Sequence, residues 1–144
     1  MAEAKRLEFA VGVDQTGVMH AEGRSPIEPS GDWTPEHLLL AGLARCSMNS
    51  LRYHAKRAGS SVDGRVTASG AVTRRADGRF AFVEEHVGVD VTIEPEPQAL
   101  DELVMKAERD CFVGASLTAV PTYSWRVNGR IVDEALAAVR RPDE

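Results

Sequence analysis

PEHLLLAGLARC, residues 35–46, opens the longest helix that the sequence predicts. Thr34 suits the N-cap, Pro35 suits the first helical position, and the glutamate after it favours the positive end of the helix dipole. No proline interrupts residues 36–58, and Gly59 is placed to end the helix. The first half of this helix is apolar on nearly every side, so it must be covered all round. Either a sheet wraps it or a second subunit covers it.

Strand and turn patterns around this helix predict an α+β fold. Apolar residues alternate over residues 7–13 and a turn follows at residues 14–17, which predicts a β-hairpin. Downstream, an Asp-Gly turn signal separates two further strands, and a second helix is predicted from about Gln98. A last strand, residues 120–127, precedes an amphipathic C-terminal helix, residues 130–141. Because hairpins rather than crossovers connect the predicted strands, we expect a largely antiparallel sheet.

The composition excludes several classes of protein and site. With 144 residues and a net charge of -5, the chain suits a single domain, residues 1–144, and offers no basic surface for nucleic acid. Its two cysteines are too few for a secreted disulfide scaffold, and no Cys/His set has the spacing of structural zinc. No signal-peptide pattern opens the chain, and no apolar run approaches the ~18 residues of a membrane span. We therefore expect a cytoplasmic protein with reduced thiols, without metal, cofactor, nucleic-acid partner or membrane partner.

Cys46 and Cys111 are the only cysteines, and two interpretations of them stay open. A cysteine on the apolar face of a helix is more often a small core residue than a nucleophile. Cys111 falls on the apolar face of the second predicted helix, whereas Cys46 lies where the long helix changes from apolar to basic. Cationic neighbours lower the pKa of a thiol, so two arginines close by in sequence predict a lowered pKa for Cys46. Ser47 and Asn49 are small polar groups able to hydrogen-bond to its thiolate.

Two motifs resemble those of a known family. The pattern Pro-Glu-x-Leu-Leu-Leu-Ala-x-Leu-Ala-x-Cys at residues 35–46 resembles the first-cysteine motif of the osmotically inducible protein C and organic hydroperoxide resistance (OsmC/Ohr) family. Ala107-x-x-x-Cys111, followed by Ala-Ser-Leu at residues 115–117 and a strand, resembles its second-cysteine motif. The order of elements matches over nearly the whole chain. The resemblance implies an OsmC-like fold with a long central helix, and an intertwined homodimer.

The resemblance also implies an activity and roles for three residues. The activity is a thiol-dependent peroxidase that reduces organic hydroperoxides, an antioxidant role in the oxidative stress response. Cys46 takes the place of the peroxidatic nucleophile, Cys111 that of the thiol which resolves it as a disulfide, and Glu36 that of the family's glutamate. The implied reductant is a dithiol, such as the lipoyl group of a protein.

The chain departs from the family pattern in the first hairpin turn and after the second cysteine. The family's peroxidases carry an arginine in the first hairpin turn, whereas residues 14–17 contain none. Arg6, Arg24 and Arg45 are candidates to replace it, and no spacing argument selects one. The proline that usually follows the second cysteine is Phe112 here. These departures support an alternative function, an OsmC-like redox sensor or small-ligand binder with little turnover, and a third interpretation is a structural domain with two inert thiols.

Helix geometry restricts what Glu36 can do. On one continuous helix, Glu36 and Cys46 lie ~15 Å apart along the axis, so they cannot touch within one chain. Any influence of Glu36 on the thiol must therefore cross a subunit interface. The simpler interpretation of Glu36 is a favourable charge in the first helical turn, worth ~0.3 to 1 kcal/mol.

Apolar residues near the two motifs also have two interpretations. As the lining of a site, they would favour an alkyl or lipid hydroperoxide over hydrogen peroxide, and otherwise they are ordinary core residues. These residues are Trp33, Leu39, Leu43 and Phe112. The four histidines and Tyr53 are expected to be surface or structural residues.

Overall fold

The computed structural model describes residues 4–28 and 32–132. The chain divides into two compact units, residues 1–35 and residues 36–144. The helices and strands, in chain order, are β1 (Val11–Val13), β2 (Met19–Ala21), α1 (Pro35–Arg57), β3 (Ser61–Arg74), β4 (Phe80–Glu94), α2 (Leu100–Arg109), α3 (Phe112–Ala115), β5 (Thr122–Val127) and β6 (Arg130–Val132). In the part of the chain that the structure describes, no helix is long and apolar enough to cross a membrane.

The first unit contains the predicted hairpin, in which β1 and β2 pair in antiparallel register. Asp14 organises the turn, because its carboxylate accepts hydrogen bonds from the backbone N–H and the hydroxyl of Thr16, at 2.9 and 2.6 Å. Gly17 completes the turn with a φ of 89°, a conformation that glycine adopts at little cost. The first strand is shorter than predicted, since it begins only at Val11.

The second unit contains a four-stranded sheet in the order β3-β4-β5-β6. β3 and β4 are antiparallel and are joined at the predicted Asp-Gly turn, where Gly78 has a φ of 87°. β4 and β5 are parallel, whereas β5 and β6 are antiparallel. The expectation that hairpins alone connect the strands is therefore wrong at one place. Parallel neighbours require a crossover, and the segment with α2 and α3 provides it between β4 and β5.

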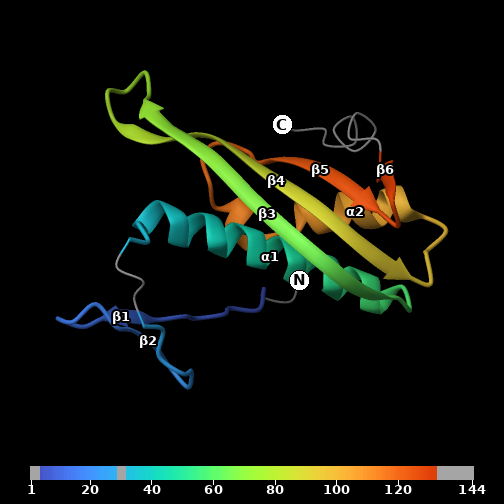
Figure 1. The fold of residues 1–144 in the computed structure, drawn as a ribbon, viewed down its shortest axis with the longest axis horizontal. Helices are drawn as coiled ribbons and strands as arrows, with labels where there is room; N and C mark the ends of the chain where they lie inside the picture. Colours follow the sequence, from blue (N-terminus) through green and yellow to red (C-terminus); the bar gives the residue numbers. More distant parts are fainter. Residues whose placement is uncertain (1–3, 29–31, 133–144) are drawn as a thin grey trace. The chain divides into compact units, whose positions relative to one another are not determined.

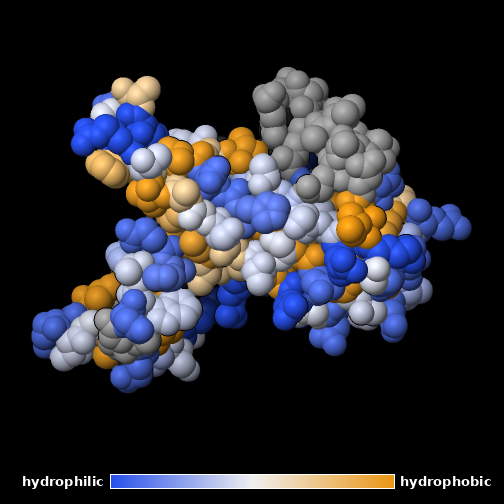
Figure 2. Space-filling view, turned by 45° about the horizontal axis from the view of Figure 1, so that its top comes forward, coloured by the Kyte–Doolittle hydropathy of each residue, from blue (hydrophilic) through white to orange (hydrophobic). Residues whose placement is uncertain are grey.

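Helix α1 covers the predicted residues, and Gly59 ends it with a φ of 82°. α1 and α2 contribute to one core with the sheet (Figure 1), and Leu43 and Leu51 of α1 are fully buried in that core. Within this unit the first half of α1 is not covered on every side, because Leu38 is 39% exposed. Figure 2 shows other apolar residues at the surface, interleaved with hydrophilic ones.

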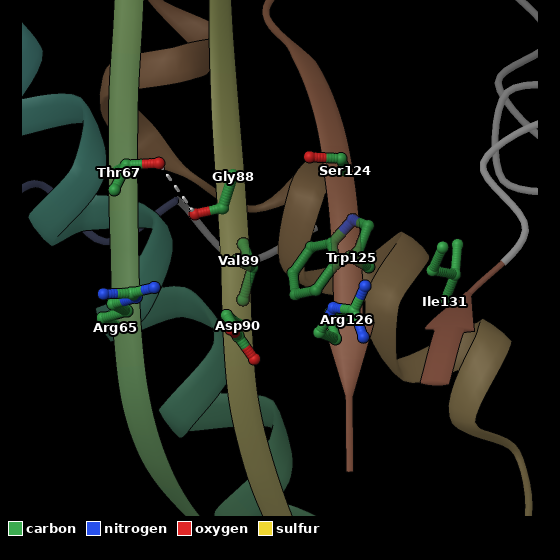
Figure 3. Close-up of a pocket in the computed structure, with 9 residues that line it drawn as sticks. All are labelled: Arg65, Thr67, Gly88, Val89, Asp90, Ser124, Trp125, Arg126 and Ile131. Atoms are coloured by element: carbon green, nitrogen blue, oxygen red, sulfur yellow. Dashed lines mark hydrogen bonds between the residues drawn. The ribbon is translucent and has the colours of Figure 1, made fainter. Parts of the chain in front are cut away.

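The two faces of the sheet differ in chemistry. The inner face carries the apolar core, whose members on β4 and β5 are almost fully buried: Val87, Val89, Val91, Ile93, Tyr123, Trp125 and Val127. The outer face is polar, and Figure 3 shows Arg65, Asp90 and Arg126 in one row across β3, β4 and β5. Cys111 belongs to the core cluster and Cys46 packs against it, so both thiols lie on the inner side.

The second helix differs from its prediction at both ends. α2 begins at Leu100 and ends at Arg109, so Cys111 is not part of it. Cys111 is instead the N-cap of α3, and its sulfur accepts a hydrogen bond from the N–H of Gly114. The predicted position of Cys111 on the core side is confirmed, because the residue is fully buried.

The predicted C-terminal helix is wrong at its start. Residues 130–132 form β6 and pair with β5, and the remaining residues of that prediction, 133–141, lie outside the described residues. The cause is the dipeptide Asn128-Gly129, whose two φ angles are positive, 53° and 78°. Such a dipeptide favours a tight hairpin turn, and the turn returns the chain to the sheet.

Candidate active site

Two thiols that are far apart in sequence meet on the inner side of the sheet. Cys46 lies in the middle of α1 and is half-buried, whereas Cys111 lies between α2 and α3 and is fully buried. Both are free thiols. Adjacent residues of α3, Val113 and Gly114, donate their N–H groups to one sulfur each, so the two thiols are neighbours. The thiol of Cys111 acts on the pKa of Cys46.

The first turn of α3 directs backbone N–H groups at both sulfurs. The N–H of Val113 donates to Sγ of Cys46 at 3.5 Å, and the N–H of Gly114 donates to Sγ of Cys111 at 3.4 Å. Neighbouring peptide groups thus contact one sulfur each. Because these donors favour the charged form of a thiol, they partly offset the cost of burying it.

A buried serine and a buried tyrosine complete the site. The hydroxyl of Ser47 lies 3.0 Å from the hydroxyl of Tyr123 and 3.7 Å from Sγ of Cys111. Ser47 follows Cys46 on α1, and Tyr123 projects from the inner face of β5. Ser47 was expected to hydrogen-bond to the thiolate of Cys46, whereas its hydroxyl contacts the sulfur of Cys111 instead. Asn49, the other candidate, is exposed.

The pKa of Cys46 is raised, which corrects the sequence-based expectation that it is lowered. Burial is the main cause, and the neighbouring thiol of Cys111 raises the pKa further, both as a hydrogen-bond partner and as a second negative charge. The N–H groups of Val113 and Phe112 act in the opposite direction and are outweighed. Arg45 and Arg52 are exposed and are not among the groups that act on the thiol.

Glu36 does not join the two thiols within one chain. It lies in the first turn of α1 and is exposed. Because α1 is continuous from that turn to Cys46, the separation along the axis is ~15 Å. The structure therefore brings Cys46 and Cys111 together and leaves Glu36 apart from them.

The apolar residues expected near the motifs divide into core and surface. Leu43 is fully buried and is plain core, whereas Leu39 is 36% exposed and Phe112 is 64% exposed. Trp33 lies in the first unit and is also exposed. An apolar lining made by all four residues is therefore not formed inside the second unit.

His54 and His86 make hydrogen bonds that are consistent with structural roles. His54 of α1 lies 2.7 Å from the carboxylate of Asp110, next to Cys111 in sequence. On the outer face of the sheet, His86 contacts the hydroxyls of Thr122 and Ser124 at 2.8 and 3.0 Å. Tyr53 is exposed and stacks edge-on against His54, as expected of a surface residue.

Sequence reasoning did not find three groups of this site, namely the hydroxyl of Tyr123 and the backbone N–H groups of Val113 and Gly114. Tyr123 had a signal, because residues 121–127 alternate between buried and exposed positions and a tyrosine on the buried face needs a hydrogen-bond partner. The two N–H groups had no sequence signal, because the pattern predicts one helix that continues through Cys111 and no separate short helix after it.

This arrangement can reduce a small oxidant by two electrons, with the two thiols oxidised to a disulfide. The half-buried thiol of Cys46 is accessible to a small oxidant, whereas the fully buried Cys111 is not. A sulfenic acid formed on the first sulfur would meet the second thiol without diffusion of another molecule, and the two would condense to a disulfide.

Sequence comparison identifies one family. A family model described as OsmC-like protein matches residues 28–126, which include both cysteines and Glu36. No curated protein sequence matches the chain at a significant level.

Solved structures with the same fold come from several bacteria. An OsmC-like protein of unknown function from Vibrio cholerae is 15% identical, with a TM-score of 0.65 over 85% of this chain and 99% of that one. The organic hydroperoxide resistance protein OhrB of Bacillus subtilis is 18% identical, with a TM-score of 0.54 over 84% and 96%. An organic hydroperoxide resistance protein from Elizabethkingia anophelis is 20% identical, with a TM-score of 0.55 over 85% and 98%. At these identities the likeness concerns the fold.

Proposed function

Because this chain belongs to the OsmC-like protein family, we propose that it is a thiol-dependent peroxidase that reduces organic hydroperoxides. Cys46 is the nucleophile and Cys111 is the resolving thiol. The observation that supports this most is that a half-buried and a fully buried thiol from distant parts of the chain accept hydrogen bonds from adjacent N–H groups of α3. The names of similar structures, organic hydroperoxide resistance proteins, supply the substrate class.

The proposed reaction has three steps. The thiolate of Cys46 attacks the distal oxygen of the hydroperoxide ROOH, the O–O bond breaks, and the alkoxide takes a proton and leaves as ROH. The sulfenic acid on Cys46 then condenses with the thiol of Cys111, forming an S–S bond and releasing water. A dithiol reductant exchanges with this disulfide and is itself oxidised to a disulfide, which restores both thiols.

Steady-state turnover tests the proposed function. With cumene hydroperoxide and an excess of dihydrolipoamide, we expect peroxide loss to continue for many equivalents per chain, because the disulfide is reduced in each cycle. Peroxide loss is measured by ferrous xylenol-orange assay against a control without protein. Peroxide loss that stops after one equivalent per chain would contradict a peroxidase.

A redox sensor is the second candidate function, and one specific observation favours it. The pKa of Cys46 is raised, and no arginine or lysine of the described residues is among the main causes of the shift. A thiol in that state reacts slowly with peroxide, because the thiolate is the nucleophile. The single stoichiometric oxidation that contradicts the peroxidase is the result expected of the sensor.

The active molecule is proposed to be a homodimer in which Glu36 of a second copy approaches Cys46. Exposed apolar residues on the first half of α1, Leu38 at 39% and Leu39 at 36%, support this. Gly42 also supports it, because a glycine inside a helix costs ~1 kcal/mol relative to alanine, and no atom of the described residues outside the helix's own backbone lies within 4 Å of a Cβ built there. Sedimentation equilibrium is expected to give the mass of two chains at micromolar concentration, and the mass of one chain would contradict the homodimer.

A further inference from the structure

The hydroxyl of Ser47 stands between a phenol and the resolving thiol. It lies 3.0 Å from the hydroxyl of Tyr123 and 3.7 Å from Sγ of Cys111. All three side chains are buried, with exposed fractions of 2% for Ser47, 4% for Tyr123 and 0% for Cys111. Bulk water therefore has little access to these groups, and the direction of the hydrogen bonds depends on the three groups themselves.

The protonated tyrosine allows one direction that places a donor on the sulfur. Burial raises the pKa of Tyr123 far above its ordinary value, so the phenol keeps its proton throughout the physiological range. Its O–H can donate to the oxygen of Ser47, and the proton of Ser47 is then free to point at the sulfur of Cys111. In this arrangement the hydrogen bonds run from phenol to serine to sulfur, which the two distances allow.

The resolving step needs such a donor. When Cys111 attacks the sulfenic sulfur, negative charge develops on its own Sγ in an apolar core, where an unpaired charge is costly. The N–H of Gly114 at 3.4 Å is one donor to this sulfur. The hydroxyl of Ser47 approaches the same sulfur as a second donor, from α1 rather than from α3.

We propose that Ser47, oriented by Tyr123, is a positioning residue that stabilises the thiolate of Cys111 while the disulfide forms. This inference rests on the proposed peroxidase chemistry and adds residues to its second step. In that step Cys111 gives up its proton, its sulfur bonds to the sulfur of Cys46, the S–O bond of the sulfenic acid breaks, and the hydroxyl leaves with the proton as water. Ser47 and Tyr123 are neither oxidised nor consumed.

Another buried serine on the same helix provides a matched control. Ser50 is 8% exposed and donates its hydrogen bond to the carbonyl oxygen of Ala107 at 2.8 Å. It links α1 to α2, and its hydroxyl donates to a backbone carbonyl rather than to a sulfur. Ser50→Ala therefore removes a buried hydroxyl from the same helix and leaves the hydrogen bonds to the two sulfurs in place.

Single-turnover kinetics test the proposal. The reduced full-length chain is mixed with cumene hydroperoxide without reductant, and the sulfenic acid, trapped with dimedone, and the disulfide are followed by mass spectrometry. In Ser47→Ala we expect sulfenic acid to form at the wild-type rate and the disulfide to form about tenfold more slowly, the loss of one hydrogen bond to a charged group. Tyr123→Phe is expected to slow the same step by a smaller factor, and Ser50→Ala to leave both steps unchanged.

Two further readouts separate this role from a merely structural one. In Ser47→Ala the disulfide step should keep accelerating with pH where the wild-type step has levelled, and sulfinic acid should accumulate on Cys46 at excess peroxide. Equal disulfide rates in Ser47→Ala and wild type, or equal slowing in Ser50→Ala, would overturn the proposal.

A failure of the peroxidase itself is recognised separately. If wild type forms no sulfenic acid, the proposed function fails, and 4,4′-dithiodipyridine is then used in place of peroxide. The accessible thiol of Cys46 forms a mixed disulfide and releases one thiopyridone, and attack by Cys111 on that disulfide releases a second one, which is followed by absorbance. Ser47→Ala is still expected to slow that reaction about tenfold relative to Ser50→Ala. An equal rate in the two variants would overturn the role of Ser47 independently of any peroxide chemistry.

Discussion

Replacing Cys46 with serine is expected to reduce the rate of organic hydroperoxide loss by about a thousandfold or more, down to the rate with reductant alone. A serine hydroxyl is far less ionised at neutral pH than a thiol and cannot form a sulfenic acid, so the first step has no nucleophile. The measurement is loss of cumene hydroperoxide in the presence of dihydrolipoamide. Folding is checked by circular dichroism, because Cys46 is only half-buried and the change removes little packing.

Cys111→Ser is the matched control for this prediction. It leaves the nucleophile in place and removes the resolving thiol, so a sulfenic acid should still form on Cys46 and be trapped by dimedone, while no disulfide appears within the chain. The opposite pattern, with turnover kept in Cys46→Ser and the first oxidation lost in Cys111→Ser, would exchange the roles of the two thiols. Turnover kept in both variants would exclude both thiols from the reaction.

The rate at which Cys46 reacts with iodoacetamide is expected to rise about a hundredfold between pH 7 and pH 9. Burial, and next the thiol of Cys111, raise the pKa of Cys46 above its ordinary value of 9.0, so the neutral thiol dominates over this whole range. Only the thiolate reacts, and below the pKa its fraction grows about tenfold per pH unit. The reaction rate of Cys46 should therefore rise continuously with pH, without a plateau near neutrality.

Cys111→Ala tests the contribution of the second thiol to that profile. Because Cys111 raises the pKa of Cys46 through a hydrogen bond and through charge, its removal should make Cys46 react faster at pH 7 and flatten the rise. A wild-type rate that levels off below pH 7 would contradict the prediction. It would show that a cation outside the described thiol site, from the first unit or a second copy, lowers the pKa.

The elements with strong local signals were predictable from the sequence. The bounds of α1 follow from a proline at its first position and Gly59 after its last turn, and the turn at Gly78 follows from the Asp-Gly pair. The Asn128-Gly129 pair carried an equally local signal, and overlooking it produced a C-terminal helix where β6 begins. Errors of this kind come from competing patterns, since the residues after that turn also fit a helical period.

The parallel pairing of β4 with β5 was harder to predict from the sequence. It joins segments separated by α2 and α3, and packing against the core decides it rather than any turn. The position of Cys111 shows the same limit. Its burial followed from an apolar period, but the break in the helix at Arg109 did not, and that break makes Cys111 the N-cap of α3.

The sequence by itself determined the family, the long helix that carries Cys46, and the class of chemistry that two thiols allow. Only the tertiary structure decided that these thiols are neighbours, that Val113, Gly114 and Ser47 supply donors to their sulfurs, and that the pKa of Cys46 is raised rather than lowered. The physical reason is that helix periods, caps and turns are properties of neighbouring residues. Burial and hydrogen bonding at a sulfur depend instead on groups from α1, α3 and β5 that meet only when the chain has folded.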